Sequence, residues 1–70
     1  MGKFVVIELQ TTMDGQVLHI VDAFDNQDAA ESKYHTILAA AAISTLPCHA
    51  ACILSGEGFP VAHACYKHEA

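Results

Sequence analysis

Residues 3–24 read KFVVIELQTTMDGQVLHIVDAF, and this stretch decides the fold. Residues 3–12 and 16–24 are rich in β-branched and aromatic side chains, which favour strands. Asp14 and Gly15 lie between them as a strong signal for a two-residue hairpin turn. The sequence therefore opens with two strands that should pair antiparallel.

A two-residue turn also sets the expected register of this hairpin. It places Leu9 opposite Ile20, and most other cross-strand partners then agree in polarity. Asp22 is the exception, because it falls opposite Ile7 on the apolar face. We therefore expect Asp22 to lie at the margin of the sheet.

A helix is expected after the second strand. Residues 25–28 (DNQD) supply capping side chains and negative charge for a first turn, and residues 29–44 contain the best helix formers of the chain. Apolar side chains recur there at the spacing of one helix face, which predicts an amphipathic helix. Four successive alanines at residues 39–42 leave a slim surface, and Pro47 ends the segment.

The second half of the chain predicts another hairpin. Residues 48–55 (CHAACILS) and 59–66 (FPVAHACY) are the expected strands, and residues 56–58 are the turn. The order is ββαββ, which is an α+β fold with two hairpins flanking one helix and the helix packed on one face of a mostly antiparallel sheet. A chain of 70 residues has room for one core, so residues 1–70 are expected to form a single small domain.

The dimensions of these elements predict assembly. Four strands at about 4.8 Å spacing make a sheet nearly 20 Å wide, whereas one helix of about 10 Å covers roughly half of one face. The uncovered side chains would form an apolar patch that monomers rarely expose. We therefore expect a homodimer or a higher homo-oligomer.

Charge and composition exclude several classes of protein. Eight acidic residues against three lysines give a net charge of −5, which leaves no cationic stripe for a nucleic acid backbone. The chain is 53 % hydrophobic and therefore too apolar for intrinsic disorder, while its longest apolar stretch, residues 37–43, is too short for a membrane span. Glu8 interrupts the first apolar run before it reaches signal-peptide length, so we expect a cytoplasmic protein with no membrane contact.

Cysteine and histidine gather late in the chain, at Cys48, His49, Cys52, His63, Cys65 and His68. Strand residues four apart lie about 13 Å from each other, so Cys48 and Cys52 should not share a zinc ion. If Gly56 and Glu57 form a two-residue turn, Cys48 lies opposite Cys65. Packed, reduced cysteines are the expectation, with an oxidation-prone pair and a metal site as alternatives.

Neither catalysis nor a cofactor is expected. A 70-residue chain with one helix has little volume for a pocket that excludes water around an oriented thiol and base. His19, His35 and His49 are each expected to be solvated or partly buried.

Three segments carry a resemblance to a known group: KFVVIELQT at residues 3–11, AESKYHTILAAAAIS at 30–44 and CYKHE at 65–69. With them the chain resembles short uncharacterised proteins encoded by phages and mobile elements of gut Firmicutes, over nearly its whole length. None of the three segments is a catalytic motif. The resemblance implies a small phage-type protein in a bacterial host cytosol, and it brings no activity or ligand.

The leading functional hypothesis is a non-enzymatic oligomeric binding module that occupies a host protein through an acidic surface. Negative charge is available at Asp14, Asp25, Asp28, Glu31, Glu57 and Glu69. Among these, Asp25, Asp28 and Glu31 concentrate around the start of the helix. We therefore assign these three to partner binding.

Two alternatives remain open. One is a sponge for a small nucleotide signal at a subunit interface, in which backbone amides of the 56–58 turn or the helix start replace the missing arginines. Its ligand pocket would use Tyr34, Thr36, Ser44, Thr45, Gly56 and Gly58. The other is a metal or redox module that uses the late cysteine and histidine cluster.

Overall fold

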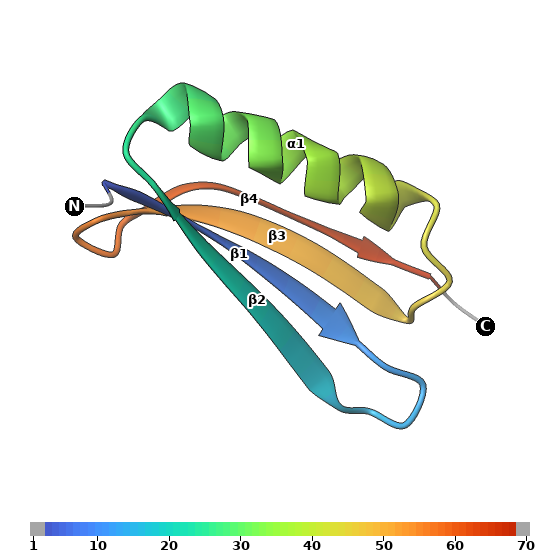
Figure 1. The fold of residues 1–70 in the computed structure, drawn as a ribbon. Coiled ribbons are helices and arrows are strands. Elements are labelled where there is room, and N and C mark those ends of the chain that lie inside the picture. The colour runs from blue at the N-terminus through green and yellow to red at the C-terminus, as the bar shows by residue number, and fades with distance from the viewer. Residues whose placement is uncertain (1–2, 69–70) are drawn as a thin grey trace.

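Four antiparallel strands form one open sheet of order β2-β1-β3-β4, and one helix crosses one of its faces (Figure 1). The computed structural model describes residues 3–68, so Glu69 lies outside the described residues. The elements are β1 (Phe4–Thr11), β2 (Val17–Phe24), α1 (Gln27–Ala42), β3 (Cys48–Ser55) and β4 (Pro60–Lys67). The ββαββ order and the α+β class predicted from the sequence are confirmed.

Both hairpins close through a three-residue loop, so the two-residue turn expected at Asp14 and Gly15 is wrong, whereas the turn expected at residues 56–58 is confirmed. In the first hairpin Thr12 N donates to Gln16 O at 2.8 Å around residues 13–15, and in the second Ser55 N donates to Phe59 O at 2.8 Å around residues 56–58. The last residue of each loop is a glycine with positive φ, 88° at Gly15 and 90° at Gly58. This is the loop in which a glycine in the left-handed region follows a type I turn.

Both registers differ from those that two-residue turns would give, because each loop is one residue longer and the second hairpin has a further register shift between Ile53 and Leu54. In the first hairpin Leu9 pairs with His19 rather than with Ile20, a slip of one residue that moves the side chains of β2 to the opposite face. Asp22 consequently lies opposite Val6 on the helix side.

The second hairpin slips by two residues, so its side chains keep their expected face. Cys48 pairs with Lys67 and Ala50 pairs with Cys65, rather than Cys48 with Cys65. The two cysteines are therefore diagonal neighbours on one face.

The core lies between α1 and the two central strands. Its buried members come from the helix, from β1 and from β3: Val6, Ala30, Tyr34, Ile37, Ala51 and Ile53. Phe4, Phe24, Leu38, Ala62 and Ala64 pack around them and are partly buried. The even positions of β1 thus face the helix, as alternation along a strand requires.

Capping fixes both ends of the helix. The Asn26 side chain accepts a hydrogen bond from Ala29 N at 2.8 Å, and Asp28 places negative charge in the first turn. At the other end, His68 Nε2 lies 2.8 Å from Ala41 O, so the ring N–H donates to a carbonyl of the last helical turn that also accepts from Ser44 N at 3.2 Å. His68 N also donates to Pro47 O at 2.9 Å, which ties the end of β4 to the link that follows the helix.

The opposite face of the sheet carries no other element of residues 3–68 (Figure 1). By register, β1 and β2 contribute aliphatic side chains to this open face, with Leu9, Val17 and Val21 38 %, 59 % and 54 % exposed. We call the apolar side chains of this part the aliphatic half-face; they are Val5, Ile7, Leu9, Val17, Val21 and Ala23, and His19 and Thr11 lie on the same face opposite Leu9 and Val17. The half formed by β3 and β4 is different, because it carries Cys48, Cys52, His63, Cys65 and Lys67.

Candidate functional site

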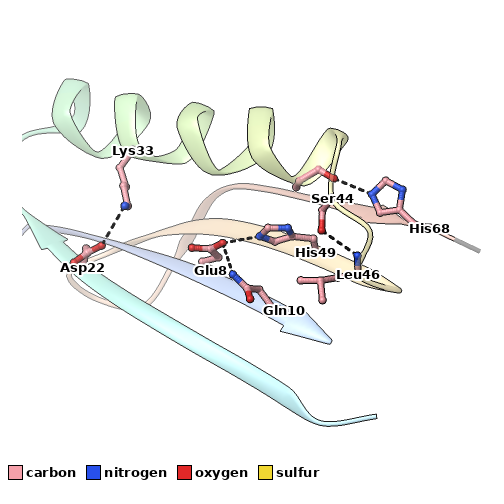
Figure 2. Close-up of polar contacts among 9 residues, drawn as sticks. Glu8, Gln10, Asp22, Lys33, Ser44, Leu46, His49 and His68 are labelled. Atoms are coloured by element: carbon pink, nitrogen blue, oxygen red, sulfur yellow. Dashed lines mark hydrogen bonds and ion pairs between the residues drawn. The ribbon is translucent and has the colours of Figure 1, made fainter. Parts of the chain in front are cut away.

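A buried polar cluster lies between the central strands and the helix (Figure 2). Glu8 of β1 and His49 of β3 are on the helix side of the sheet, and His49 Nε2 lies 2.6 Å from Glu8 Oε2. Gln10 Nε2 donates to the same oxygen at 2.8 Å. The His49 and Glu8 side chains are only 6 % and 13 % exposed, so this contact is largely shielded from water.

Two opposing influences set the pKa of Glu8. Burial is the largest single influence and would raise this pKa, because it disfavours the charged form. The hydrogen bonds from His49 and Gln10, together with the charges of His49 and Lys33, outweigh burial and hold the pKa of Glu8 below its ordinary value. Glu8 is therefore an ionised carboxylate at neutral pH.

The second ring nitrogen of His49 determines what this cluster can do. His49 Nδ1 is buried and has no hydrogen-bond partner among residues 3–68. A histidine that activates a nucleophile needs a hydroxyl or thiol at the nitrogen that faces away from its carboxylate. Within the described residues, the cluster joins β1 to β3 beneath the helix, and His49 Nδ1 has no hydroxyl or thiol as a hydrogen-bond partner.

His49 was expected to be solvated or at most partly buried, and that expectation is wrong, since its residue exposure is 5 %. Alternation along residues 4–11 was the available signal, because it places Glu8 on the same face as Val6. A carboxylate on the buried face needs a buried partner. Nothing local in the sequence identified that partner as a residue 41 positions away.

A second ion pair lies at the β2 edge and is exposed. Lys33 Nζ is 3.9 Å from Asp22 Oδ2, and the two side chains are 40 % and 47 % exposed (Figure 2). Solvent-exposed pairs of this kind contribute at most about 1 kcal/mol to stability. Asp22 thus lies on an edge strand, at the margin of the sheet, with Lys33 as its partner.

Two of the late cysteines meet on the open face. The sulfur atoms of Cys48 and Cys65 are 3.0 Å apart, and both thiols are free. The hydrogen bond with Cys48 and burial raise the pKa of Cys65, while Lys67 acts in the opposite direction. Cys52 pairs in register with His63 on the same face. Within residues 3–68 no group of three or more histidine, cysteine, aspartate or glutamate side chains is placed to hold a metal ion.

Acidic residues gather at one end of the molecule. Asp25 follows the end of β2, and Asp28 lies in the first turn of α1, where both are exposed. Glu57 is at the tip of the β3–β4 loop, at the same end of the sheet (Figure 1). Lys3 lies between them, because its N donates to Phe24 O at 2.9 Å and its O accepts from Gly56 N at 2.7 Å.

The three predicted partner-binding residues thus share one end, although they differ in exposure. Asp25 and Asp28 are exposed, whereas Glu31, one turn further along the helix, is half-buried. Sequence reasoning left Glu57 out of the assignment. The signal for Glu57 is the sheet topology, which brings the second hairpin loop beside the start of β1.

The residues predicted to line a ligand pocket are spread over the molecule. Tyr34 is buried in the core, whereas Thr36 is exposed on the helix, where its hydroxyl donates to Ser32 O at 2.9 Å. Ser44 and Thr45 follow the C-terminal end of α1, at the opposite end of the sheet from the 56–58 loop (Figure 1).

Three of the backbone amides that could bind a phosphate in place of arginine side chains already donate hydrogen bonds to oxygen atoms of the protein. Gly56 N donates to Lys3 O at 2.7 Å, and Gly58 N donates to Ser55 O at 2.9 Å. At the start of the helix, Ala29 N donates to the Asn26 side chain. A phosphate at any of these amides would have to displace a protein oxygen.

Comparisons with protein-family models, with curated proteins and with solved structures found no match to this chain. Among the described residues, no helix has the length and apolar character needed to cross a membrane.

Proposed function

We propose that this protein is a non-enzymatic binding module that pairs with a second copy through its aliphatic half-face and offers its acidic end to a basic protein. The exposure of the aliphatic half-face carries the proposal. Val17 and Val21 are more than half exposed there, whereas α1 covers the central strands on the opposite face and leaves Leu18 and Ile20 of β2 each 48 % exposed. Folded monomers rarely leave a contiguous apolar surface of this kind in water.

Charge favours this face over the helix as the contact between copies. The chain carries a net charge of −5, so two copies repel each other wherever their acidic surfaces meet. The aliphatic half-face contains no carboxylate and no lysine. The exposed side of α1, in contrast, carries Asp28 and the polar residues Ser32, His35 and Thr36. A twofold contact of the half-face with itself avoids like-charge repulsion.

Light scattering with a matched pair of variants tests the contact. Val21 and Ile20 are neighbours on β2 with exposures of 54 % and 48 %, but their side chains lie on opposite faces of the sheet. We expect the mass of two copies for the native chain at micromolar concentration, the mass of one copy for Val21→Lys, and the mass of two copies for Ile20→Lys.

A third variant distinguishes a contact through the helix. Ala40 is exposed on α1, so Ala40→Leu should leave the mass unchanged if the copies meet through the sheet. Loss of the dimer in Ala40→Leu but not in Val21→Lys would move the contact to the helix. A native chain with the mass of one copy would contradict self-association altogether.

A basic partner is supported by the clustering of three carboxylates at one end, those of Asp25, Asp28 and Glu57. The resemblance described above suggests that this partner is a bacterial host protein in the cytosol. Charges at a rim attract an oppositely charged partner over about 8–10 Å at physiological ionic strength, so they act mainly on the rate of association. Binding at this end should therefore weaken as salt is added.

A lysine-rich peptide serves as a defined probe for the acidic end. We expect Asp28→Lys to reduce its association rate several-fold at low salt. Asp14→Lys is the matched control, since it makes the same change of charge at the opposite end of the sheet (Figure 1). If the association rate fell equally in the two variants, the peptide would be attracted by net charge alone. That result would contradict a binding surface at the start of the helix.

A further inference from the structure

The thiols of Cys48 and Cys65 form a close pair on the open face of the sheet. Their sulfur atoms are 3.0 Å apart, about 1 Å more than the 2.05 Å of a disulfide bond. Cys48 is half-buried and Cys65 is exposed. Neither thiol lies under α1, because the helix covers the other face.

The register of the hairpin holds the two thiols together. Cys48 pairs with Lys67, and Cys65 pairs with Ala50, so the thiols are diagonal neighbours on two hydrogen-bonded strands. His68 N, which donates to Pro47 O at 2.9 Å, closes the same end of the hairpin. Cys52 is on the same face, pairs with His63 and is the other diagonal neighbour of Cys65, but the close sulfur contact joins Cys65 to Cys48.

We propose that Cys48 and Cys65 are a reversible dithiol–disulfide site that exchanges with low-molecular-weight disulfides. Cys65 is exposed, so its thiolate attacks one sulfur of the small disulfide, forms a mixed disulfide and releases the first small thiol. Cys48 then attacks the sulfur of Cys65 and displaces the second small thiol. Two electrons and two protons pass from the protein to the small disulfide, which becomes two thiols, while one S–S bond forms in the protein.

Oxidation would stabilise the β3–β4 hairpin. The new bond closes the loop of residues 48–65 and restricts the unfolded chain. We expect the melting temperature to rise by about 5–15 °C relative to the reduced protein. The site lies outside the aliphatic half-face, so it does not depend on self-association.

The pH dependence of the exchange follows from the environment of Cys65. Its hydrogen bond with Cys48 and its partial burial raise the pKa of Cys65, so the thiolate is scarce at neutral pH. The rate of exchange should therefore increase about tenfold per pH unit between pH 7 and 8.5. A rate that is independent of pH would contradict attack by this thiolate.

The test is incubation of the folded chain in mixtures of oxidised and reduced glutathione. We expect the free thiol count to fall from three to one, the intact mass to drop by two hydrogens, and peptide mapping to locate the bond between Cys48 and Cys65. Cys52→Ser is the matched control and should oxidise as the native chain does. Cys48→Ser should instead stop at a stable glutathione adduct on Cys65.

Three results would overturn the proposal. The first is a native chain that keeps three free thiols in fully oxidised glutathione. The second is a bond that includes Cys52, and the third is cross-linking between chains instead of within one chain. None of these results depends on whether the native protein is a dimer, because Val21→Lys can be oxidised in the same mixtures and carries the same three cysteines.

Discussion

Glu8 and His49 stabilise the fold as a pair, because either group alone would be a buried polar group without its partner. We expect His49→Leu to lower the free energy of unfolding by about 2–3 kcal/mol, since it leaves the Glu8 carboxylate unpaired beneath the helix. The double variant Glu8→Leu with His49→Leu should recover most of that loss, as an apolar pair of similar volume. Urea unfolding of the native chain, of the single variants His49→Leu and Glu8→Leu, and of the double variant measures both effects.

Additivity is the outcome that would contradict this coupling. If the double variant lost the sum of the two single losses, the two side chains would act independently. The pair would then contribute packing rather than electrostatic compensation.

The lowered pKa of Glu8 predicts a loss of stability in acid. In the unfolded chain this carboxyl titrates near 4.5, and in the folded chain it titrates lower. Its contribution is therefore complete above pH 4.5 and is lost as the pH falls through the folded pKa. The free energy of unfolding of the native chain should fall more steeply below pH 4.5 than that of Glu8→Gln, measured by urea unfolding at a series of pH values.

The pKa of Asp14 is also lowered, by its hydrogen bond with Thr12. Asp14 is present in both the native chain and Glu8→Gln, so the difference between their pH profiles reports on Glu8. Parallel pH profiles for the native chain and Glu8→Gln would contradict the assignment.

At the scale of the elements, local composition was sufficient to find every strand and the helix. The strand predicted at residues 48–55 has the observed bounds, and the helix was displaced by two residues at each end. The hairpin loops could not be predicted as well, because a glycine after an acidic residue suits both two-residue and three-residue loops. The hydroxyls of Thr12 and Ser55 accept from Gln16 N at 3.2 Å and Phe59 N at 3.1 Å, a detail that favours the longer loop.

One residue of loop length decides which face of a strand is covered. Because the first loop is longer than expected, Ile20 faces the helix side and His19 faces the open side. In the second hairpin the loop and a register shift between Ile53 and Leu54 each add one residue, so residues 48–53 keep their expected face and the two thiols stay on one side. This is why the cysteine pair could be anticipated from the sequence, while the surroundings of β2 could not.

At the scale of the whole molecule, the parts that escaped prediction depend on the pairing of β1 with β3. Glu8 and His49 meet across this pairing, and Lys3 brings the second hairpin loop to the acidic end. Local periodicity describes each hairpin separately and contains no information on which strands become neighbours. The buried ion pair and the position of Glu57 therefore required the structure.

The central position of the β1–β3 pairing has a consequence for synthesis of the chain. A nascent chain that ends at residue 47 contains β1, β2 and α1 but lacks the core residues Ala51 and Ile53 and the partner of one edge of β1. Within this fragment Val6 is the one strand residue of the buried core on which α1 could pack, so we expect a fragment of residues 1–47 to show no cooperative thermal transition by circular dichroism. A cooperative transition in that fragment would contradict this view. We therefore expect the apolar residues of the first hairpin and of α1 to stay exposed on the nascent chain until β3 has been made.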